Sequence, residues 1–548
     1  MSIVQNNVLL VIVDNLRPAL GAYGVHDVLS PHIDALAAQS TLFSRAYCSE
    51  AWCAPSRNSF LSGRRPDTSR AWNFRDSFRA SAGGAEQPGA NWTTLPGWMK
   101  QRGYYATSSG KVFHPSLPAN FDYPRSWSDE PVLQNKWACQ PGVALSNVSY
   151  MACEYPTGMN ATAFSGDNGT ATLAIERLRA WHAQHGRSAA AERPFFLAVG
   201  FQSPRLPWSY PRYAAARYNA SSLAIARHRD APAASTGVAD ATLEWFRPVE
   251  VAGYADVVAE GGVTHGRPLS DALQRRLRLA YYAAISHVDD QVGRLLAELR
   301  RLGVDESTAI VFTADHGQNL GEANMWSMMN LLETSLRVPL LVRPAPRDAR
   351  FATMAVYDQP VELVDLFPTV AALAGVAAPP AEWRLPGRDL TAVLRRGVGG
   401  GGGRRAGASE LVEGEARAAF SQITRCSNCT LAYSGAADNE EEGCAADGVD
   451  ALKYTVPCAL TPRAAFDWMG MSVRTANWRY TVYCAWSGEA LRANWSRCAP
   501  PELFNHSEDV ALYDVDDNGE PFANVAGGAA SGALEARLRA RLRATFDP

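Results

Sequence analysis

Short runs of almost entirely apolar residues recur along the first part of the chain. The clearest are Val8–Val13, Pro194–Phe201 and Ala309–Ala314, and each is bounded by polar or turn-forming residues. Runs of this length and composition are typical of strands buried on both faces, as in a parallel sheet that helices cover. The pattern therefore predicts three core strands of such a sheet.

A long helical pattern lies between two of these runs. From Asp271 to Leu302 apolar residues recur at helical spacing, and Gly303 follows as a stop signal. Strands that alternate with helices predict an α/β domain with a mostly parallel sheet. Ligands of such sheets gather at the carboxyl ends of strands, where this chain has Asp14-Asn15 and Asp315-His316.

The pattern changes after a glycine-rich segment at residues 397–407, which holds almost nothing that could pack in a core. The chain beyond it predicts short strands of an antiparallel sheet and a final helix. We therefore expect an N-terminal α/β domain at residues 1–410 and a smaller α+β domain at residues 411–548.

The elements expected in the second domain follow from alternation and turn chemistry. Met471–Thr475 and Trp478–Cys484 alternate apolar and polar residues, and Val510–Asp514 is a further short strand. Asp516–Gly519 predicts a turn, and Ala533–Ala544 predicts the last helix.

Composition excludes several classes of protein. The 548 residues are 47% hydrophobic and 20% charged, which rules out wholesale disorder. Basic and acidic residues nearly cancel at 52 and 55, so the chain is not a dedicated nucleic-acid binder. No apolar run approaches the about 20 residues that a membrane helix needs.

The compartment is indicated by sequons and cysteines. Eight Asn-x-Ser/Thr sequons occur, at Asn91, Asn147, Asn160, Asn168, Asn219, Asn428, Asn494 and Asn505. Together with ten cysteines, several of them clustered, they favour a secreted or lysosome-like protein with disulfides over a cytoplasmic one. The run before Asp14 predicts a core strand, and it lacks the basic start and cleavage site of a signal peptide. Loss of a leader from this version of the chain is one explanation, and a cytoplasmic location is the other.

The segment Cys53-Ala-Pro-Ser-Arg57 carries the most informative chemistry. Cys53 fits an N-cap, Pro55 suits a first helical turn, and Gly63 ends a short helix. Residue 53 would then face the positive end of the helix with Arg57 one turn along, which makes an anion site. The alternative is a buried structural cysteine before a helix.

The whole motif, with the Gly-Arg that follows the helix, resembles the modification motif of the type I sulfatases. Further segments resemble the iduronate-2-sulfatase branch: Asn7–Pro18, Gly63–Thr68, Gly110–Pro115, Tyr282–Leu296, Met469–Thr475 and Arg479–Val482. The resemblance implies a sandwich of the alkaline-phosphatase type around a large, mostly parallel sheet. It makes residues 1–410 the sulfatase catalytic domain.

The resemblance also implies a cofactor pair. In this family the motif cysteine, here Cys53, is oxidised to formylglycine (3-oxoalanine), whose hydrated aldehyde is the nucleophile. Asp14, Asn15, Asp315 and His316 would form a metal site with residue 53, and oxygen-rich ligands suit calcium. The branch has a second Asp where this chain has Asn15, so one negative charge is missing.

Three further residues match the family's catalytic groups. Arg57 and Lys111 would balance charge on the sulfate, and His114 would accept a proton when the sulfated intermediate collapses. Lys111 is the more telling match, because the chain has only four lysines.

Two departures affect the side of the site that faces the leaving group. The family places a His at Arg205 and a Lys at Met328, and both family residues contact the sulfate. Arg205 could still hold the anion as a substrate-binding residue, but a guanidinium is a very poor acid. Met328 can neither hold an anion nor donate a proton, which indicates a relaxed or reshaped site.

The sequence as a whole predicts a sulfuric ester hydrolase that resembles iduronate-2-sulfatase. We expect it to act on a sulfated carbohydrate or small sulfate ester and to need a formylglycine-generating enzyme for maturation. Two alternatives remain, a catalytically impaired homologue that binds glycans, and a phosphate or phosphonate ester hydrolase with the same nucleophile.

The cysteine count changes once Cys53 is assigned to chemistry, because nine cysteines then remain for disulfides. The resemblance implies a bridge between Cys139 and Cys153. The other expected pairings are Cys484 with Cys498 and two bridges among Cys426, Cys429, Cys444 and Cys458, with Cys48 as the spare thiol. An unpaired surface loop is the alternative for that cluster of four, and zinc is disfavoured because no suitable His pair follows.

Overall fold

The computed structural model describes residues 5–81, 84, 86–134, 150–155, 166–185, 193–227, 229, 251, 254–262, 267–395, 417–425, 431–432, 443–444, 458, 461–466, 468–506, 524–528 and 531–547. No helix within these ranges combines the length and the apolar character needed to cross a bilayer.

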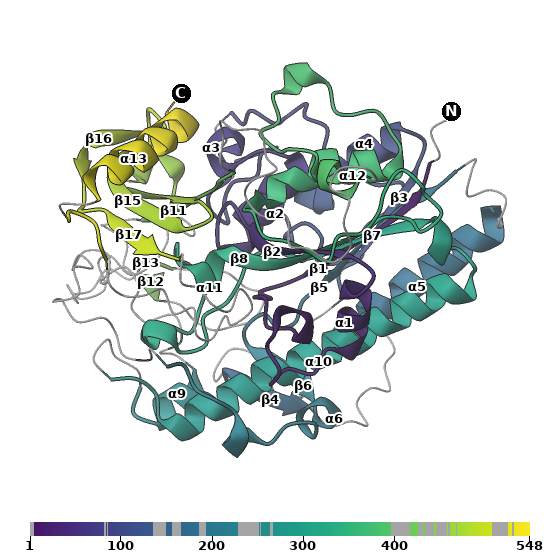
Figure 1. The fold of residues 1–548 in the computed structure, drawn as a ribbon, viewed down its shortest axis with the longest axis horizontal. Coiled ribbons are helices and arrows are strands. Elements are labelled where there is room, and N and C mark those ends of the chain that lie inside the picture. The colour runs from purple at the N-terminus through teal and green to yellow at the C-terminus, as the bar shows by residue number, and fades with distance from the viewer. Residues whose placement is uncertain are drawn as a thin grey trace.

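A large mixed sheet forms the centre of the molecule (Figure 1). Its strands lie in the order β10-β2-β8-β7-β1-β5-β3, and β9 pairs with β2. The bounds are β1 Asn7–Val13, β2 Thr41–Tyr47, β3 Tyr105–Gly110, β5 Phe195–Phe201, β7 Thr308–Ala314, β8 Arg337–Arg343, β9 Val356–Tyr357 and β10 Val361–Glu362. Only the pairings of β8 with β2 and β7 are antiparallel within the described part of this sheet. The three predicted core strands are confirmed as β1, β5 and β7, and every residue of these strands is buried.

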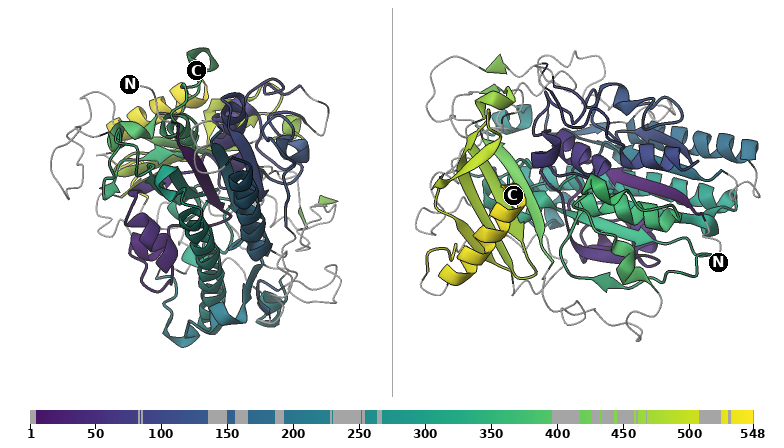
Figure 2. Two further views of the ribbon diagram at one scale, coloured as in Figure 1. Left: turned by 90° about the vertical axis from the view of Figure 1, so that its right-hand side faces the viewer. Right: turned by 90° about the horizontal axis from the view of Figure 1, so that it is seen from above.

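Helices cover both faces of the sheet, which makes a three-layer sandwich (Figures 1 and 2). One face carries α1 (Pro31–Ala37), α5 (Gly166–His185) and α10 (Asp271–Arg301). The other face carries α2 (Cys53–Ser62), α4 (Leu95–Gln101) and α12 (Leu366–Ala374). The long predicted helix is confirmed as α10. The remaining short elements are α3 Pro66–Ser69, α6 Arg212–Ala215, α9 Ala255–Ala259, α11 Glu333–Leu336, β4 Ala152–Tyr155 and β6 Trp208–Pro211.

An antiparallel sheet lies beside the sandwich near the C-terminus (Figure 2). Its order is β11-β14-β15-β16, with β17 also paired to β15. The bounds are β11 Ala419–Arg425, β14 Trp468–Arg474, β15 Trp478–Ser487, β16 Arg492–Cys498 and β17 Glu502–Asn505. Helix α13 (Gly532–Phe546) packs against β14 and β15. Two further short strands, β12 (Leu431–Ala432) and β13 (Gly443–Cys444), pair with each other. The α+β character predicted for this part of the chain is confirmed. The glycine-rich segment, the predicted strand at residues 510–514 and the turn at residues 516–519 lie outside the described residues, and the domain boundary at residue 410 remains a prediction.

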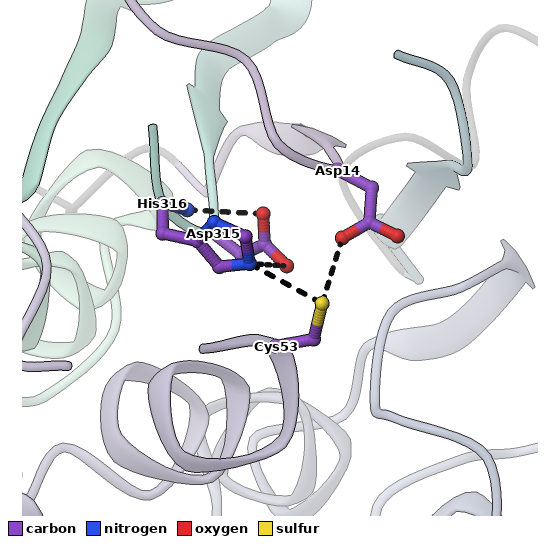
Figure 3. A group of neighbouring side chains, drawn as sticks. All are labelled: Asp14, Cys53, Asp315 and His316. Carbon is purple, nitrogen blue, oxygen red and sulfur yellow. Dashed lines mark hydrogen bonds and ion pairs between the residues drawn. The ribbon is translucent and has the colours of Figure 1, made fainter. Parts of the chain in front are cut away.

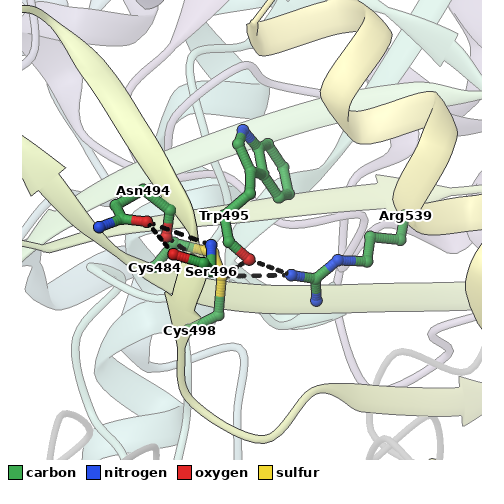
Figure 4. Close-up of a disulfide and its surroundings, with 6 residues drawn as sticks. All are labelled: Cys484, Asn494, Trp495, Ser496, Cys498 and Arg539. Carbon is green, nitrogen blue, oxygen red and sulfur yellow. Dashed lines mark hydrogen bonds between the residues drawn. A yellow bond between two sulfur atoms is a disulfide. The ribbon is translucent and has the colours of Figure 1, made fainter.

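One expected disulfide is confirmed among the described cysteines. Cys484 on β15 and Cys498 at the end of β16 form a disulfide, which ties neighbouring strands together (Figure 4). Cys153 and Cys458 each take part in a disulfide. Cys48 is a buried free thiol, as expected of the spare cysteine. Cys139, Cys426 and Cys429 lie outside the described residues, so their pairings remain predictions.

A buried charge network joins the two sheets. Glu333 in α11 accepts a hydrogen bond from the Tyr47 hydroxyl at 2.7 Å and one from Arg474 Nε at 3.1 Å. It also forms an ion pair with Arg479, and all three charged side chains are at most 2% exposed. Burial opposes ionisation of Glu333, but Arg474 and Arg479 outweigh it and lower its pKa well below the usual range. A single carboxylate therefore forms ion pairs with two guanidinium groups from the C-terminal sheet.

We expect Glu333→Gln to destabilise the protein by about 3–5 kcal/mol, because it removes the buried carboxylate that pairs with both guanidinium groups. The wild-type contribution is present above the ordinary glutamate pKa of about 4.3 and is lost as the pH falls below it, since the folded-state pKa is depressed. Thermal unfolding from pH 7 to pH 3 should show this acid-side loss in the wild type and a smaller one in the variant. Glu306→Gln, at an exposed position, is the matched control. Equal melting temperatures for the two variants would contradict the assignment.

Candidate active site

Cys53 is the first residue of helix α2, directly after a segment that returns from β2. Trp52 is the N-cap, with extended backbone angles of φ -153° and ψ 138°, so the expectation that Cys53 is the N-cap was one residue off. The helix ends at Gly63, which has a left-handed φ of 72°, as predicted. All ten residues of α2 are buried. The Cys53 thiol therefore projects from the positive end of a helix that is held inside the protein.

Two adjacent strands bring the acidic residues to this thiol. Asp14 follows β1, Asp315 and His316 follow β7, and these strands are parallel neighbours whose carboxyl ends coincide. Cys53 Sγ lies 3.3 Å from Asp14 Oδ1 and 3.2 Å from His316 Nε2. The four side chains point toward one another (Figure 3), and one candidate ligand atom from each falls within 4.8 Å of the others. All four are at most 1% exposed, so the predicted cluster is a buried cradle of donor atoms.

Two cations neutralise the acids of this cradle. Arg57 Nε lies 2.9 Å from Asp315 Oδ2, and its Nη2 lies 3.2 Å from Asp14 Oδ1. Lys111 Nζ lies 2.6 Å from the second oxygen of Asp14. Burial opposes ionisation of Asp14, but Lys111 and then Arg57 outweigh it and lower its pKa well below the usual range. Burial, reinforced by Asp14, raises the pKa of the Cys53 thiol, which is therefore protonated at neutral pH.

Asn15 reaches the same cradle through an unusual backbone conformation. Its φ of 61° is left-handed, a region that Asn and Asp enter more readily than most residues. The backbone N–H donates to Asp315 Oδ1 at 3.0 Å, and the side-chain Oδ1 lies 3.9 Å from Cys53 Sγ. Met328 lies on the far side of the Asn15 amide, with its Sδ 3.6 Å from Nδ2. Asn15 is thus brought to the cluster as predicted, and Met328 is its neighbour.

The two histidines of the site each place one ring nitrogen beside a backbone carbonyl. His316 Nδ1 lies 3.0 Å from the Gly317 oxygen, and His114 Nδ1 lies 3.0 Å from the Pro115 oxygen. Because a carbonyl only accepts, both contacts favour the tautomer protonated on Nδ1. His316 then directs an unprotonated Nε2 at Cys53. His114 is buried, and its ring centroid lies 4.9 Å from that of Phe74.

Arg205 lies on a loop that a buried carboxylate holds in place. Asp167 in the first turn of α5 accepts hydrogen bonds from the backbone N–H groups of Gln202 at 2.6 Å and Ser203 at 3.1 Å. The loop then carries Arg205, a half-buried residue whose charge contributes to lowering the pKa of Asp14. Asp167 was missed by sequence reasoning, because an acidic residue in the first turn of a helix is usually only a favourable end charge.

Comparison with known proteins now places the chain in a family. The sulfatase family model matches residues 6–376. Mouse iduronate 2-sulfatase is 36% identical over 407 residues, which cover 68% of this chain and 69% of that protein. Human iduronate 2-sulfatase is 32% identical over 565 residues, which cover 94% of this chain and 92% of that protein. The chain belongs to the sulfatase family.

Solved structures agree with the fold of this sulfatase. A phosphonate monoester hydrolase from Silicibacter pomeroyi superposes with a TM-score of 0.64 at 20% identity, over 99% of this chain and 95% of that one. A 2-O GAG sulfatase superposes with a TM-score of 0.60 at 16% identity, over 99% and 92% of the two chains. The predicted alkaline-phosphatase type of sandwich is confirmed.

We expect Asp167→Asn to lower kcat/KM for sulfate esters by about tenfold or more. The two backbone N–H groups that hold the Arg205 loop donate to different oxygens of Asp167, and Asn replaces one of these acceptors with an NH2 donor. Asp256→Asn is a matched control, since that buried carboxylate also accepts from two backbone N–H groups, those of Met151 and Ala152. Steady-state kinetics and melting temperatures of both variants decide the point. A fall in activity no larger in Asp167→Asn than in the control would contradict a role specific to the Arg205 loop.

Proposed function

We propose that this sulfatase hydrolyses sulfuric esters of glycans with a formylglycine made from Cys53 and a calcium ion held by Asp14, Asn15, Asp315 and His316. The observation that carries the proposal is the position of the Cys53 thiol. It lies between Asp14 and His316, at the positive end of α2, and both Arg57 and Lys111 pair with Asp14. A group attached at residue 53 would therefore lie among donor atoms for a cation and close to two fixed positive charges.

The donor set fits a hard divalent cation. Asp14, Asp315 and the Asn15 amide supply oxygens, which calcium prefers. His316 resembles a ligating histidine, because its Nδ1 faces a carbonyl and its Nε2 faces the cradle. A bound calcium ion would supply electrophilic assistance at the sulfate ester.

The state of Cys53 supports its conversion. It is one of two free, buried thiols among the described cysteines, and it begins the motif that resembles the sulfatase modification site. Once oxidised and hydrated, residue 53 would supply the hydroxyl that attacks sulfur and would later release sulfate by returning to the aldehyde.

The protein's own side chains then divide the remaining work. Arg57 and Lys111 hold positive charge where the sulfate oxygens gain negative charge in the transition state. His114, whose Nδ1 lies beside the Pro115 carbonyl, would accept a proton at Nε2 when sulfate is released. Arg205 contributes charge to binding the anion but cannot protonate the leaving oxygen.

Sulfated sugars are the proposed substrates, because the curated relatives quoted above are iduronate 2-sulfatases and one solved neighbour is a 2-O GAG sulfatase. A phosphonate or phosphate ester is the second candidate, favoured by the phosphonate monoester hydrolase neighbour. A catalytically impaired, glycan-binding homologue is the third, and it is motivated by Asn15, Arg205 and Met328.

Passage through a secretory pathway remains part of the proposal. Asn91, Asn219 and Asn494 of the predicted sequons lie at exposed positions, where a glycan could be attached without disturbing the core. Asn147, Asn160 and Asn428 lie outside the described residues. The formylglycine-generating enzyme is the proposed partner for maturation.

Cys53→Ala should abolish turnover of an activated aryl sulfate, by at least about a thousandfold, because the attacking atom is lost. Cys48→Ala is the matched control, since it removes the other buried free thiol. Both variants and the wild type are made together with a formylglycine-generating enzyme, and the peptide around Cys53 is analysed by mass spectrometry. The wild type and Cys48→Ala should carry an aldehyde in place of the thiol and hydrolyse the ester. An unmodified Cys53 without turnover would exclude the enzymatic proposal, and faster turnover of the matched aryl phosphonate would favour the second candidate.

Wild-type rates should fall steeply as the leaving group becomes more basic, because Arg205 is no proton donor. Arg205→His should raise turnover of alkyl sulfates by about tenfold or more and leave activated aryl sulfates nearly unchanged. The gain should disappear above the imidazole pKa of about 6.5. Arg205→Lys keeps the charge without a donor of suitable pKa and serves as the control. Equal gains from both substitutions would show that the leaving group is protonated by another residue.

A further inference from the structure

The orientation of the Gln318 side chain is determined by the backbone around it. Its Nε2 donates to the carbonyl oxygen of Trp326 at 2.7 Å and faces that of Asn319 at 3.3 Å. Because both carbonyls only accept, the nitrogen end of this amide must face them and the oxygen end must face away. Gln318 is fully buried, so water does not offer it other partners.

That oxygen determines the orientation of Asn15 in turn. Gln318 Oε1 accepts from Asn15 Nδ2 at 2.7 Å, and Met328 Sδ lies 3.6 Å from the same nitrogen. Both neighbours of Nδ2 are acceptors, which an amide nitrogen with two hydrogens can satisfy. The Asn15 oxygen is left to face Cys53 Sγ and the cradle. The backbone carbonyls thus fix the orientation of the Gln318 amide, which in turn fixes the orientation of the Asn15 amide and the position of its Oδ1 atom, a candidate ligand.

We propose that Gln318 is a positioning residue, and that with Met328 it forms a pocket of acceptors that selects a neutral amide at position 15 and aims its oxygen at the bound cation. The proposal rests on the cation site proposed above. It also gives Met328 a role, because its thioether is a neutral acceptor beside the Asn15 amide nitrogen.

An aspartate at position 15 would match asparagine in size and backbone conformation, but the oxygen that replaces Nδ2 would not fit its surroundings. Asp is nearly the same size as Asn and tolerates the left-handed backbone that Asn15 adopts. Its second oxygen would replace Nδ2 and would lie 2.7 Å from Gln318 Oε1, so two acceptors would face each other. Gln318 cannot reverse its amide to donate, since its own oxygen would then face the carbonyls of Trp326 and Asn319. The surroundings of residue 15 therefore oppose an aspartate there, although its extra negative charge would favour binding of a cation.

Calcium affinity is the first test, measured by isothermal titration on metal-stripped full-length protein. Gln318→Met removes the directing oxygen at similar size and should weaken calcium binding by about tenfold or more, as loss of a group that orients a ligand does. Gln291→Met is the matched control, because Gln291 is also a buried glutamine, bonded to the His287 carbonyl in α10. It should leave the affinity unchanged within about twofold. Wild-type binding that neither substitution weakens would overturn the positioning proposal and leave the proposed function intact.

The second test is a double-mutant cycle on the metal-free protein, so its result does not depend on cation binding. Melting temperatures are measured in chelator for the wild type, Asn15→Asp, Gln318→Met and the double variant. Asn15→Asp should lower the melting temperature more in the chain with Gln318 than in the chain that carries Gln318→Met, because only the first opposes two acceptors. Strictly additive shifts in melting temperature would overturn the positioning proposal, whether or not the protein binds calcium. Absence of calcium binding in the wild type would count against the cation site, which is a separate question.

Discussion

Arg57 is the residue on which the rest of the site depends. Two fully buried carboxylates cannot lie beside one another in a dry interior unless positive charge compensates them. Arg57 meets both Asp14 and Asp315 through different nitrogens, and it donates as well to the backbone oxygens of Lys111 and, at 3.0 Å, Val112. One guanidinium therefore holds the ends of β1 and β7, the start of α2 and the Lys111 segment in a single arrangement. The planar fork of Arg suits this position in a way that a lysine would not.

The charges of the central cluster balance. Asp14, Asp315, Arg57 and Lys111 are two buried acids and two cations. Around Asn15 the neighbours are uncharged, namely the Gln318 amide and the Met328 thioether, and Arg205 adds a fixed cation that helps to lower the pKa of Asp14. In the function proposed above, the side of the site that would prepare the nucleophile therefore has balanced charge, whereas Arg205 gives the leaving-group side a cation that is a very poor acid.

Much of this was predictable from the sequence, for a topological reason. Residues that follow two parallel neighbouring strands must meet at one edge of the sheet, so Asp14 and Asp315 could be brought together without coordinates. Likewise the short, wholly apolar run at Val8–Val13 indicated a buried strand, as observed. Gln318 and Asp167 could not be found in this way, because what they do depends on which backbone groups happen to face them. The direction of an amide is a property of its three-dimensional surroundings and leaves no periodic signal in the chain.

The burial of α2 has a consequence for the life history of the protein. Cys53 is 1% exposed, and no residue of its helix reaches the surface. An enzyme that recognises the segment from Cys53 to Arg57 needs its backbone and side chains to be accessible, which the folded state denies. The oxidation of Cys53 that we propose would therefore have to occur before the core closes around it. A chain that folds first would keep its thiol. The specific activity of a preparation would then reflect the fraction of chains that were oxidised before they folded, and purified folded protein could not be converted afterwards.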